Sequence, residues 1–514
     1  MGEVEGFGSN YTLATDTNTF WLMINSVMIF LLQVGFAMLE VGSVSPKNTK
    51  AVLIKNIGDA ALGATCWWLF GNAIAYGFSA GGFIGTSGFA LKQPIQGDLS
   101  EGVGVVAMRL GLACLAGIRS YSISYVITGE RLGLWFFQWA FAASSATIVS
   151  GAVAERVKVL SYVFCAAVLT SFIYPVVVHW AWSSQGWISP FREDDLLFGC
   201  GASDFAGSGV VHMVGGLAAL IGAKFARPRA GRFNEDGTSN KLTQQSPALQ
   251  TLGTLIMWCG WYAFNGGSSL TITGGRSEVA ARAMVNTTLA AGAATMCMVV
   301  LVKSFYKKFD SSLVNNGILA GLVAITGSAP LVETEGAFLI GIIAGAIYLG
   351  ASRLLLKLRI DDVVDATPVH LACGFWGLIA AGLFSQRDYY ADVYADNTDP
   401  NRAARCAGIF YGGNGSLLAA NLIFAICIIV WVGITTTLLF ALITVVVGLR
   451  VPLAEEEYGM DKTHHERRNS SSSVALRKAL HKTGLEGAPL TSSGAVRRTS
   501  FSQQSTSRVS SAKF

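Results

Sequence analysis

The feature that most constrains this chain is a series of apolar stretches, each about 20 residues long. A helix of about 20 residues crosses the roughly 30 Å hydrocarbon layer of a bilayer. Apolar residues make up 52% of the 514-residue chain, and charged residues only 13%. The 58 glycines fit the same class, because small residues let membrane helices approach closely. The composition therefore predicts an all-α polytopic membrane protein.

We predict eleven transmembrane helices, one for each apolar stretch, in a membrane domain over residues 20–449. The stretch 103–118 is also apolar, but it is short and contains Arg109, so we assign it to a loop. The predicted helices cover residues 20–39, 56–78, 134–153, 159–180, 205–226, 247–266, 280–303, 313–330, 335–356, 365–385 and 421–449.

The basic residues predict an extracellular N-terminus and a cytosolic C-terminus. No Lys or Arg precedes Lys47, so the first segment does not show the basic start of a signal peptide. With residues 1–19 outside, the five inner loops carry 16 Lys or Arg residues and the longer outer loops carry fewer, as the positive-inside rule requires. Asn10, in an Asn-Tyr-Thr sequence, is then a candidate glycosylation site.

Residues 450–514 differ from the rest of the chain and are predicted to form a cytosolic regulatory tail. They are rich in Ser and Thr, and hold 11 Lys or Arg against 6 Asp or Glu. The formal net charge of +5 comes from this tail, so it does not indicate a nucleic-acid-binding surface. Ser470 and Ser500 each follow an Arg-Arg-X sequence, which is typical of basic-directed protein kinase sites. The alternative is a plain disordered tail with incidental sites.

The nine cysteines show neither a CxxC pair nor a spacing typical of metal ligands, so we predict no metal and no cofactor. Cys114, Cys200 and Cys406 fall in predicted outer loops where a disulfide can form, but the odd total leaves the pairing open. No nucleophile with an adjacent base stands out either, and we do not predict an enzyme.

Two histidines lie within apolar stretches in matched sequences. His212 and His370 each follow Val, each precede Gly by four residues, and follow Asp204 and Asp362 by eight. Eight helical residues rise about 12 Å, which puts both rings near mid-membrane if their helices enter from opposite sides. One interpretation is two core histidines bonded to backbone carbonyls. The matched pair favours the other, an inverted repeat whose histidines line a solute or proton path.

Three predicted helices end at the same outer level with aromatic and polar side chains. An aromatic belt at the membrane interface explains each cluster on its own. Their convergence above two buried histidines favours a vestibule for a cation, since each ring face attracts a cation by about 0.5–2 kcal/mol. Asp204 serves either as a helix N-cap or as a carboxylate that favours a cation. The clusters contain Gln138, Phe141, Trp182, Trp261, Phe264 and Ser268.

Four motifs carry a family resemblance that covers about residues 18–455. They are GAVAER at 151–156, DFAGSGVVH at 204–212, WYAFNGGS at 261–268 and GLRVP at 448–452. At these residues the chain resembles the ammonium transporter family (the Amt/Mep/Rh superfamily), most closely its plant-type branch. The resemblance implies two five-helix halves of inverted topology and a long last helix. It also implies a homotrimer with one pore in each subunit.

The resemblance implies roles for individual residues, from the outer mouth to the tail. An outer site binds the cation, a pair of aromatic rings gates the pore, and twin histidines line the pore and relay protons. The substrate-binding residues implied are Phe141, Trp182, Ser268, Gln138 and Asp204; the gate is Phe141 and Phe264; the relay is His212 and His370; the vestibule includes Trp261 and Thr326; and Thr463 is regulatory.

This chain departs from the family pattern at three positions. Leu371 follows the second histidine where family members usually have Gly, and Pro368 precedes that histidine by two. Both departures bear on how closely the tenth helix approaches the fifth. Glu40 stands where a small residue or Cys is usual, and the sequence offers no account of it.

Together these features predict a high-affinity-type ammonium transporter in the plasma membrane, with methylammonium as a substrate analogue. An ammonium ion in hydrocarbon faces a desolvation cost of order 20 kcal/mol. We therefore expect it to lose its proton below the outer site, so that ammonia passes the histidines. The alternatives are a neutral ammonia channel, an ammonium sensor with little transport, and an unrelated proton-coupled transporter.

Overall fold

The computed structural model describes residues 13–92, 128–394 and 399–464, and helices make up almost all of their regular structure. The exception among these residues is a short antiparallel pair of strands, β1 (Ser79–Ala80) and β2 (Ile84–Gly85). The predicted glycosylation site and the stretch 103–118 lie outside the described residues.

The first half of the chain contains three helices with a π-helical turn in or at the start of them. Such turns are rare and are frequent at functional sites. The elements are α1 (Leu13–Ser43), η1 (Pro46–Asn48), α2 (Thr49–Cys66), η2 (Trp67–Gly71), α3 (Asn72–Tyr76), η3 (Phe89–Leu91), α5 (Gly129–Ala152), α6 (Val159–Val168), η4 (Leu169–Ile173), α7 (Tyr174–Trp182), η5 (Leu197–Gly199), η6 (Ser208–Met213) and α8 (Val214–Ala226), with η2, η4 and η6 π-helical.

Capping residues in the sequence set several starts in the second half. Ser246 accepts a hydrogen bond from the Leu249 N–H and precedes Pro247, and Asp310 caps α11 in the same way. The elements are α9 (Pro247–Gly266), η7 (Gly267–Ser269), α10 (Arg276–Tyr306), α11 (Ser311–Thr326), α12 (Thr334–Lys357), η8 (Thr367–Ala372, π-helical), α13 (Cys373–Phe384), α14 (Arg387–Tyr394), α15 (Arg402–Arg405), η9 (Ile409–Tyr411), α16 (Ser416–Val446), α17 (Leu453–Tyr458) and α18 (Met460–His464).

Within the described residues, eight helical segments are long and apolar enough to cross a membrane. They are α1, α5, α6–α7, η6–α8, α10, α12, η8–α13 and α16. The prediction of an all-α membrane protein is thus confirmed. Each of the eleven predicted ranges overlaps a helical segment, but α9 and α2–α3 are not among the eight, and α11 is apolar but shorter.

The two histidine-bearing helices lie inside the bundle. α8 and α13 both pack against α16, while α1 packs along α9, and α10 along α11 and α12. α16 buries Phe424 and Ile428 but leaves Leu438 65% exposed. An apolar side chain on the outer as well as the inner face is what a lipid-facing helix requires.

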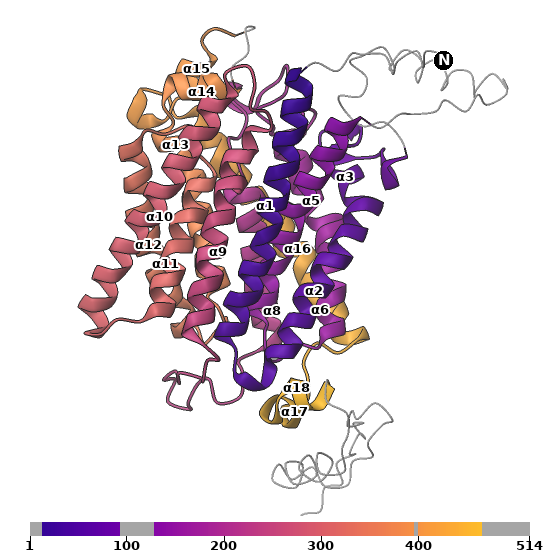
Figure 1. Ribbon diagram of the computed structural model, residues 1–514, viewed down its shortest axis with the longest axis vertical. Helices are drawn as coiled ribbons and strands as arrows, with labels where there is room; N and C mark the ends of the chain where they lie inside the picture. Colours follow the sequence, from indigo (N-terminus) through magenta and orange to yellow (C-terminus); the bar gives the residue numbers. More distant parts are fainter. Residues whose placement is uncertain (1–12, 93–127, 395–398, 465–514) are drawn as a thin grey trace, which may run out of the picture.

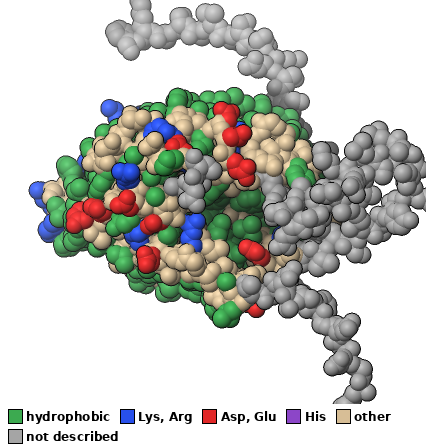
Figure 2. All heavy atoms as spheres, turned by 90° about the horizontal axis from the view of Figure 1, so that it is seen from above, with side chains coloured by type: hydrophobic (Ala, Val, Ile, Leu, Met, Phe, Trp, Pro, Cys, Tyr) green, Lys and Arg blue, Asp and Glu red, His purple; other side chains and the backbone are tan. Residues whose placement is uncertain are grey.

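The molecule has two opposite faces with different elements. In Figure 1, α14 and α15 lie at the top and α17 and α18 at the bottom, and we name these the upper and lower faces. Figure 2 views the upper face, where acidic and basic side chains are spread over the surface and hydrophobic side chains reach its rim. A polar upper face with hydrophobic side chains at its rim fits a bundle that spans a membrane.

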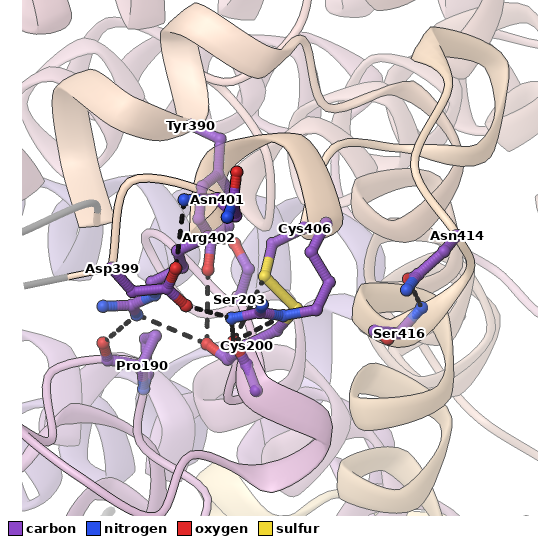
Figure 3. Close-up of a disulfide and its surroundings, with 12 residues drawn as sticks. Pro190, Cys200, Ser203, Tyr390, Asp399, Asn401, Arg402, Cys406, Asn414 and Ser416 are labelled. Carbon is purple, nitrogen blue, oxygen red and sulfur yellow. Dashed lines mark hydrogen bonds and ion pairs between the residues drawn. A yellow bond between two sulfur atoms is a disulfide. The ribbon is translucent and has the colours of Figure 1, made fainter.

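A disulfide joins Cys200, in the loop before η6, to Cys406 at the end of α15 (Figure 3). Around it, Arg402 and the Tyr390 hydroxyl both donate to the Cys200 carbonyl oxygen. Two of the three predicted loop cysteines therefore pair with each other, and Cys114 lies outside the described residues. The bond ties the loop that leads to His212 to a loop of the second half.

The start of the predicted tail is folded against the lower face. The Asp461 carboxylate accepts hydrogen bonds from the backbone N–H groups of Lys50 and Ala51, at 3.0 and 2.9 Å, in the first turn of α2. A carboxylate there also meets the positive end of the helix dipole. Residues 450–514 thus begin with a docked segment, while Ser470 and Ser500 lie outside the described residues.

Candidate functional site

A pocket of about 280 Å³ opens between α5, the end of α7 and η7, and we name it the upper pocket. Four predicted site residues, which come from α5, α7 and η7, meet in its wall. The wall is mostly aromatic and apolar, with a few polar groups, as is usual for small-ligand pockets. Its lining residues are Tyr76, Leu134, Phe137, Gln138, Phe141, Trp182, Ser184, Phe191, Phe205, Ser268 and Leu270.

Hydrogen bonds fix the orientation of two of these side chains. The Trp182 indole N–H donates to the backbone oxygen of Asp204 at 2.8 Å, and its ring meets Phe141 edge-on at 5.7 Å between centroids. The Ser268 hydroxyl donates to the Phe264 carbonyl at 2.7 Å, which leaves its oxygen lone pairs free to accept. Ring faces and a hydroxyl oxygen together favour a cation with N–H donors.

Gln138 adds an unpaired acceptor to the same wall. Its side chain is 5% exposed, and its Oε1 atom has no hydrogen-bond partner among the described residues. Leaving a buried acceptor without a partner costs about 1–3 kcal/mol. A ligand that donates to this oxygen would recover that free energy.

Phe141 forms the floor of the upper pocket, and Phe264 stacks against the ring of Phe141. Their buried rings stack with centroids 4.1 Å apart and planes at 26°. Phe264 also stacks on the His212 ring, with centroids 5.5 Å apart. The stacked rings therefore separate the upper pocket from His212.

His212 and His370 lie side by side below the floor. Their Nδ1 atoms are 3.2 Å apart, so one ring can donate to the other, and both rings are buried. The His212 Nε2 atom has no hydrogen-bond partner among the described residues. A pair of imidazoles bonded in this way can pass a proton between them.

The same device positions both histidines. Each lies in a π-helical turn, η6 or η8, that begins next to a buried aspartate. The Asp204 carboxylate accepts from two backbone N–H groups of η6 at 2.9 and 2.8 Å. The Asp362 carboxylate accepts from two at the start of η8, at 3.0 and 2.7 Å. The spacing of eight residues in the sequence is thus the separation between each capping aspartate and the histidine of the turn that it caps. Asp204 is not among the residues that line the upper pocket.

Two glycines let the histidine-bearing helices touch. A Cβ atom on Gly216 would lie 2.4 Å from the Leu371 backbone nitrogen, and one on Gly374 would lie 2.5 Å from the Ser208 carbonyl oxygen. Because the later residue of one helix meets the earlier residue of the other, the two segments run antiparallel here. Leu371 does not hold the helices apart, since its own backbone packs on Gly216.

Trp261 and Thr326 lie deeper than the predicted vestibule. The Trp261 indole N–H donates to the Thr326 hydroxyl at 2.9 Å, and its ring stacks on His212 at 5.2 Å. Both residues are buried and neither lines the upper pocket. The reason is helical geometry, because Trp261 precedes Phe264 by about one turn of α9.

Two hollows continue below the histidines. The first, the lower cavity, has a volume of about 10 Å³ and is lined by both His370 and Glu40. The second, the lower vestibule, holds about 240 Å³ at the lower face. Leu39, Asn316 and Val364 line both hollows, so they adjoin. The upper pocket, the histidine pair and the two lower hollows therefore follow one another between the upper and lower faces.

The sequence analysis did not identify two aromatic residues that lie beside the histidine pair and the upper pocket. Phe36 lies 6.2 Å from the His370 ring, between centroids, and Phe205 lines the upper pocket. Phe205 stands inside the 204–212 motif, which was a usable signal. Phe36 lies in an apolar stretch of α1, where one more aromatic residue does not indicate a functional site.

Charged residues beside the lower vestibule form a buried network. Arg229 donates to both oxygens of Asp361, at 2.8 and 2.9 Å, and also pairs with Glu155. Burial alone would raise the pKa of Asp361, but the Arg229 hydrogen bonds and charge outweigh it and hold that pKa well below its usual range. Burial opposes ionisation of Glu155 as well, and Arg229 with Ser45 lowers its pKa below the usual value.

Thr463 lies on α18, at the docked part of the tail. Its hydroxyl donates to the Gly459 carbonyl oxygen at 3.1 Å, and its side chain is partly buried. Two residues earlier, Asp461 binds the first turn of α2. A change at Thr463 therefore acts next to the contact that holds the tail.

No group of three or more His, Cys, Asp or Glu side chains that could hold a metal occurs in residues 13–92, 128–394 and 399–464. His212 and His370 supply two nitrogen atoms, whereas a zinc site needs three or four protein ligands.

A buried histidine pair between two pockets, among helices long and apolar enough to cross a membrane, is typical of a transporter or channel. The family model of the Ammonium Transporter Family matches residues 20–470. The chain belongs to this family.

Relatives and solved structures agree with that assignment. Ammonium transporter 1 member 1 of Arabidopsis thaliana is 40% identical over 442 residues, which cover 83% of this chain and 80% of the relative. Ammonium transporter 1 member 3 of Solanum lycopersicum is 37% identical over 87% of this chain and 92% of the relative. A solved Sensor Amt Protein superposes with a TM-score of 0.73 at 28% identity, over 88% of this chain and 99% of its own.

The fold also matches the Saccharomyces cerevisiae Mep2 crystal structure. The TM-score is 0.69 at 22% identity, over 86% of this chain and 90% of the other. At that identity the likeness speaks for the fold alone.

Proposed function

We propose that this protein moves ammonium and ammonia across the plasma membrane as a high-affinity-type transporter. One observation carries the proposal: the upper pocket, the Phe141–Phe264 stack and the His212–His370 pair adjoin one another in that order. Ammonium is small, carries a positive charge and has four N–H donors. These properties fit a wall of ring faces and unpaired acceptors.

The first step is capture of the ion in the upper pocket. The Trp182 and Phe141 rings attract its charge, and the oxygens of Ser268 and Gln138 accept from its N–H groups. Asp204 acts indirectly, because its backbone oxygen holds Trp182 and its carboxylate holds the turn that carries His212.

The second step is loss of the proton at the Phe141–Phe264 gate. Below it the wall offers aromatic rings and two imidazoles, which do not replace the hydration shell of an ion that costs of order 20 kcal/mol to desolvate. Neutral ammonia therefore moves past the histidines. The proton follows through the Nδ1 atoms of His212 and His370, which would make transport electrogenic.

The topology is proposed with the upper face outside. The Cys200–Cys406 disulfide on that face fits an oxidising compartment, and Arg229 and Arg232 by the lower vestibule fit a cytosolic side. We further propose eleven membrane crossings in two inverted halves, supported by the matched caps and the antiparallel contact of η6–α8 with η8–α13. The homotrimer and the tail kinases remain proposals from the family resemblance.

Uptake of labelled methylammonium into cells that express the chain tests this function. We expect saturable uptake that ammonium competes away, and strongly reduced uptake in Trp182→Ala at equal surface amounts. A chain that binds methylammonium in the membrane fraction but brings none into the cell would instead be a sensor. Uptake without any current would identify a neutral ammonia channel.

A further inference from the structure

Glu40 is a carboxyl group on the conduction path that the proposed steps leave unused. It lies on α1, is 1% exposed, and lines the lower cavity together with His370. Its Oε2 atom accepts hydrogen bonds from Asn56 and Ser150, both at 3.0 Å. Its Oε1 atom has no hydrogen-bond partner among the described residues. One oxygen is thus held in place while the other is available to a solute in the cavity.

The charged and titratable groups around Glu40 come from three elements. Lys55 and Asp59 of α2 act on it through their charges, the phenol of Tyr162 of α6 also interacts with its charge, and His370 of η8 lines the same cavity. The Lys55 ammonium group is buried and makes no hydrogen bond to any described residue, so Glu40 and Lys55 are not directly bonded. A pair with a purely structural role would be expected to satisfy both charges by direct contact.

The size of the lower cavity fits a single small solute. A volume of about 10 Å³ is near the least that admits one water-sized molecule, and ammonia is of that size. Beyond it, the lower vestibule is lined by charged side chains of both signs: Asp310, Asp362 and Asp365, and Arg229, Arg232, Lys241 and Lys308. The lower cavity is therefore the place where a neutral solute passes from the apolar path to a charged exit.

We propose that Glu40 is an inner protonation site, at which ammonia leaving His370 regains a proton; this inference rests on the proposed transport function. The O–H bond of the Glu40 carboxyl breaks and an N–H bond of ammonium forms, which leaves a carboxylate beside the new cation. The ammonium ion then departs into the lower vestibule. A proton arriving through His212 and His370 restores the carboxyl, so each cycle moves one ammonia and one proton. Lys55 stabilises the carboxylate between the two transfers.

The test compares the charge that crosses the membrane with the amount of solute taken up, measured in the same cells. We would measure ammonium-induced current and labelled methylammonium uptake for the parent, Glu40→Gln and the control Glu333→Gln. Gln keeps the size of the side chain but cannot carry the proton. Glu333 is a carboxyl at the start of α12 that accepts from the Tyr411 hydroxyl and lines neither the lower cavity nor the lower vestibule. General acid–base groups contribute about a hundredfold or more to a proton transfer, so we expect the charge moved per methylammonium to fall at least about tenfold in Glu40→Gln. We expect it unchanged in Glu333→Gln.

Glu40→Gln leaves Lys55 without its counter-charge and can lower the amount of folded protein. The double variant Glu40→Gln/Lys55→Gln removes both charges together, and it should reach the surface and show the same fall in charge per solute. Glu40→Asp, which keeps the carboxyl, should restore most of the parent ratio.

The outcomes separate this inference from the transport function. A parent that shows neither uptake nor current contradicts the transport function itself. A parent with both, and an unchanged ratio of charge to solute in the Glu40 variants, overturns only the role of Glu40. Equal losses of current and uptake, with the ratio preserved, would mean that Glu40 is structural and would also overturn it. Uptake without current in the parent contradicts the inference, because no proton then reaches Glu40.

Discussion

The two sides of the histidine pair are built from different chemistry. Above it, the upper pocket offers ring faces and the neutral oxygens of Gln138 and Ser268. Below it, the lower cavity contains the carboxyl of Glu40, and the lower vestibule is lined by acidic and basic side chains. A neutral acceptor binds a cation weakly enough to let its proton go, whereas a carboxyl can return one. In the proposed mechanism, the release and return of the proton therefore depend on the different linings above and below the histidine pair, and not on the two matched histidines.

The largest expected effect comes from pushing the two histidine helices apart, which would disconnect the two sides. Gly216→Ala places a Cβ within 2.4 Å of the Leu371 nitrogen, where backbone cannot give way as a flexible side chain would. We expect transport to fall at least about a hundredfold, as a misplaced pair of reacting groups loses about that much. Gly350→Ala is the matched control, because an added Cβ there meets nothing within 4 Å. Parent-like transport by Gly216→Ala would contradict the close approach.

The next effect concerns only the lower side. Arg229→Met removes the partner of Asp361 and Glu155 and should lower the free energy of unfolding by about 3 kcal/mol or more, since buried carboxylates lose their counter-charge. The midpoint of thermal unfolding in detergent measures this. Both folded pKa values lie below the ordinary 3.8 and 4.5. The stabilisation by the ionised carboxylates is therefore complete above pH 3.8 and 4.5, their ordinary pKa values. It is lost as the pH falls through the lower pKa values that the two groups have in the folded protein.

The predicted loss of stability in Arg229→Met is checked by comparing parent and variant at several pH values. We expect the gap between their unfolding midpoints to be constant from about pH 8 to 6 and to narrow below about pH 4. A gap that widens as the solution becomes more acidic would show that the network does not act through ionised carboxyls.

A smaller effect is expected on the upper side alone. Trp182→Ala removes one ring face from the upper pocket, and a cation–ring contact is worth about 0.5–2 kcal/mol. The methylammonium concentration at half-maximal uptake should rise about 2- to 30-fold, since 1.4 kcal/mol is about tenfold. Trp376→Ala is a useful control, because the Trp376 indole donates to the Ile340 carbonyl oxygen and neither residue lines the upper pocket. Equal shifts in both variants would remove Trp182 from the binding wall.

The smallest effect concerns regulation from the lower face. Thr463→Asp adds a negative charge two residues from Asp461, which binds the first turn of α2. We expect it to lower uptake a few-fold by disturbing the docked tail, about 1 kcal/mol of contact, while Thr463→Ala transports like the parent. Uptake measured at matched surface amounts decides the matter. Identical uptake by the two variants would exclude Thr463 from control of the pore.

Much of the fold could be predicted from the sequence, because a helix in a membrane must pair its backbone N–H and C=O groups within itself. Apolar length alone located the helical segments, and the repeated Asp–His spacing located both histidines and their caps. The predicted convergence of three outer helix ends already placed Gln138, Phe141, Trp182 and Ser268 together, and the family resemblance implied a role for each of them.

Other parts of the path required three-dimensional contacts. Trp261 was expected in the vestibule, but a residue one turn from the gate faces His212, and the sequence does not show that depth. The sequence left open whether Leu371 keeps the two histidine-bearing helices apart, and the structure shows its backbone packed on Gly216. Glu40 gave a signal as a departure from the pattern, yet only the shared lining of the lower cavity connects it to His370.

The most direct test of the account is ammonium-induced current in voltage-clamped cells, recorded for the parent and for His370→Ala at equal surface amounts. The account predicts a saturable inward current in the parent and its loss, or a relaxed selectivity among cations, in the variant, because the proton relay ends at His212. A current of the same size and selectivity in both would contradict a path in which the histidine pair carries the proton.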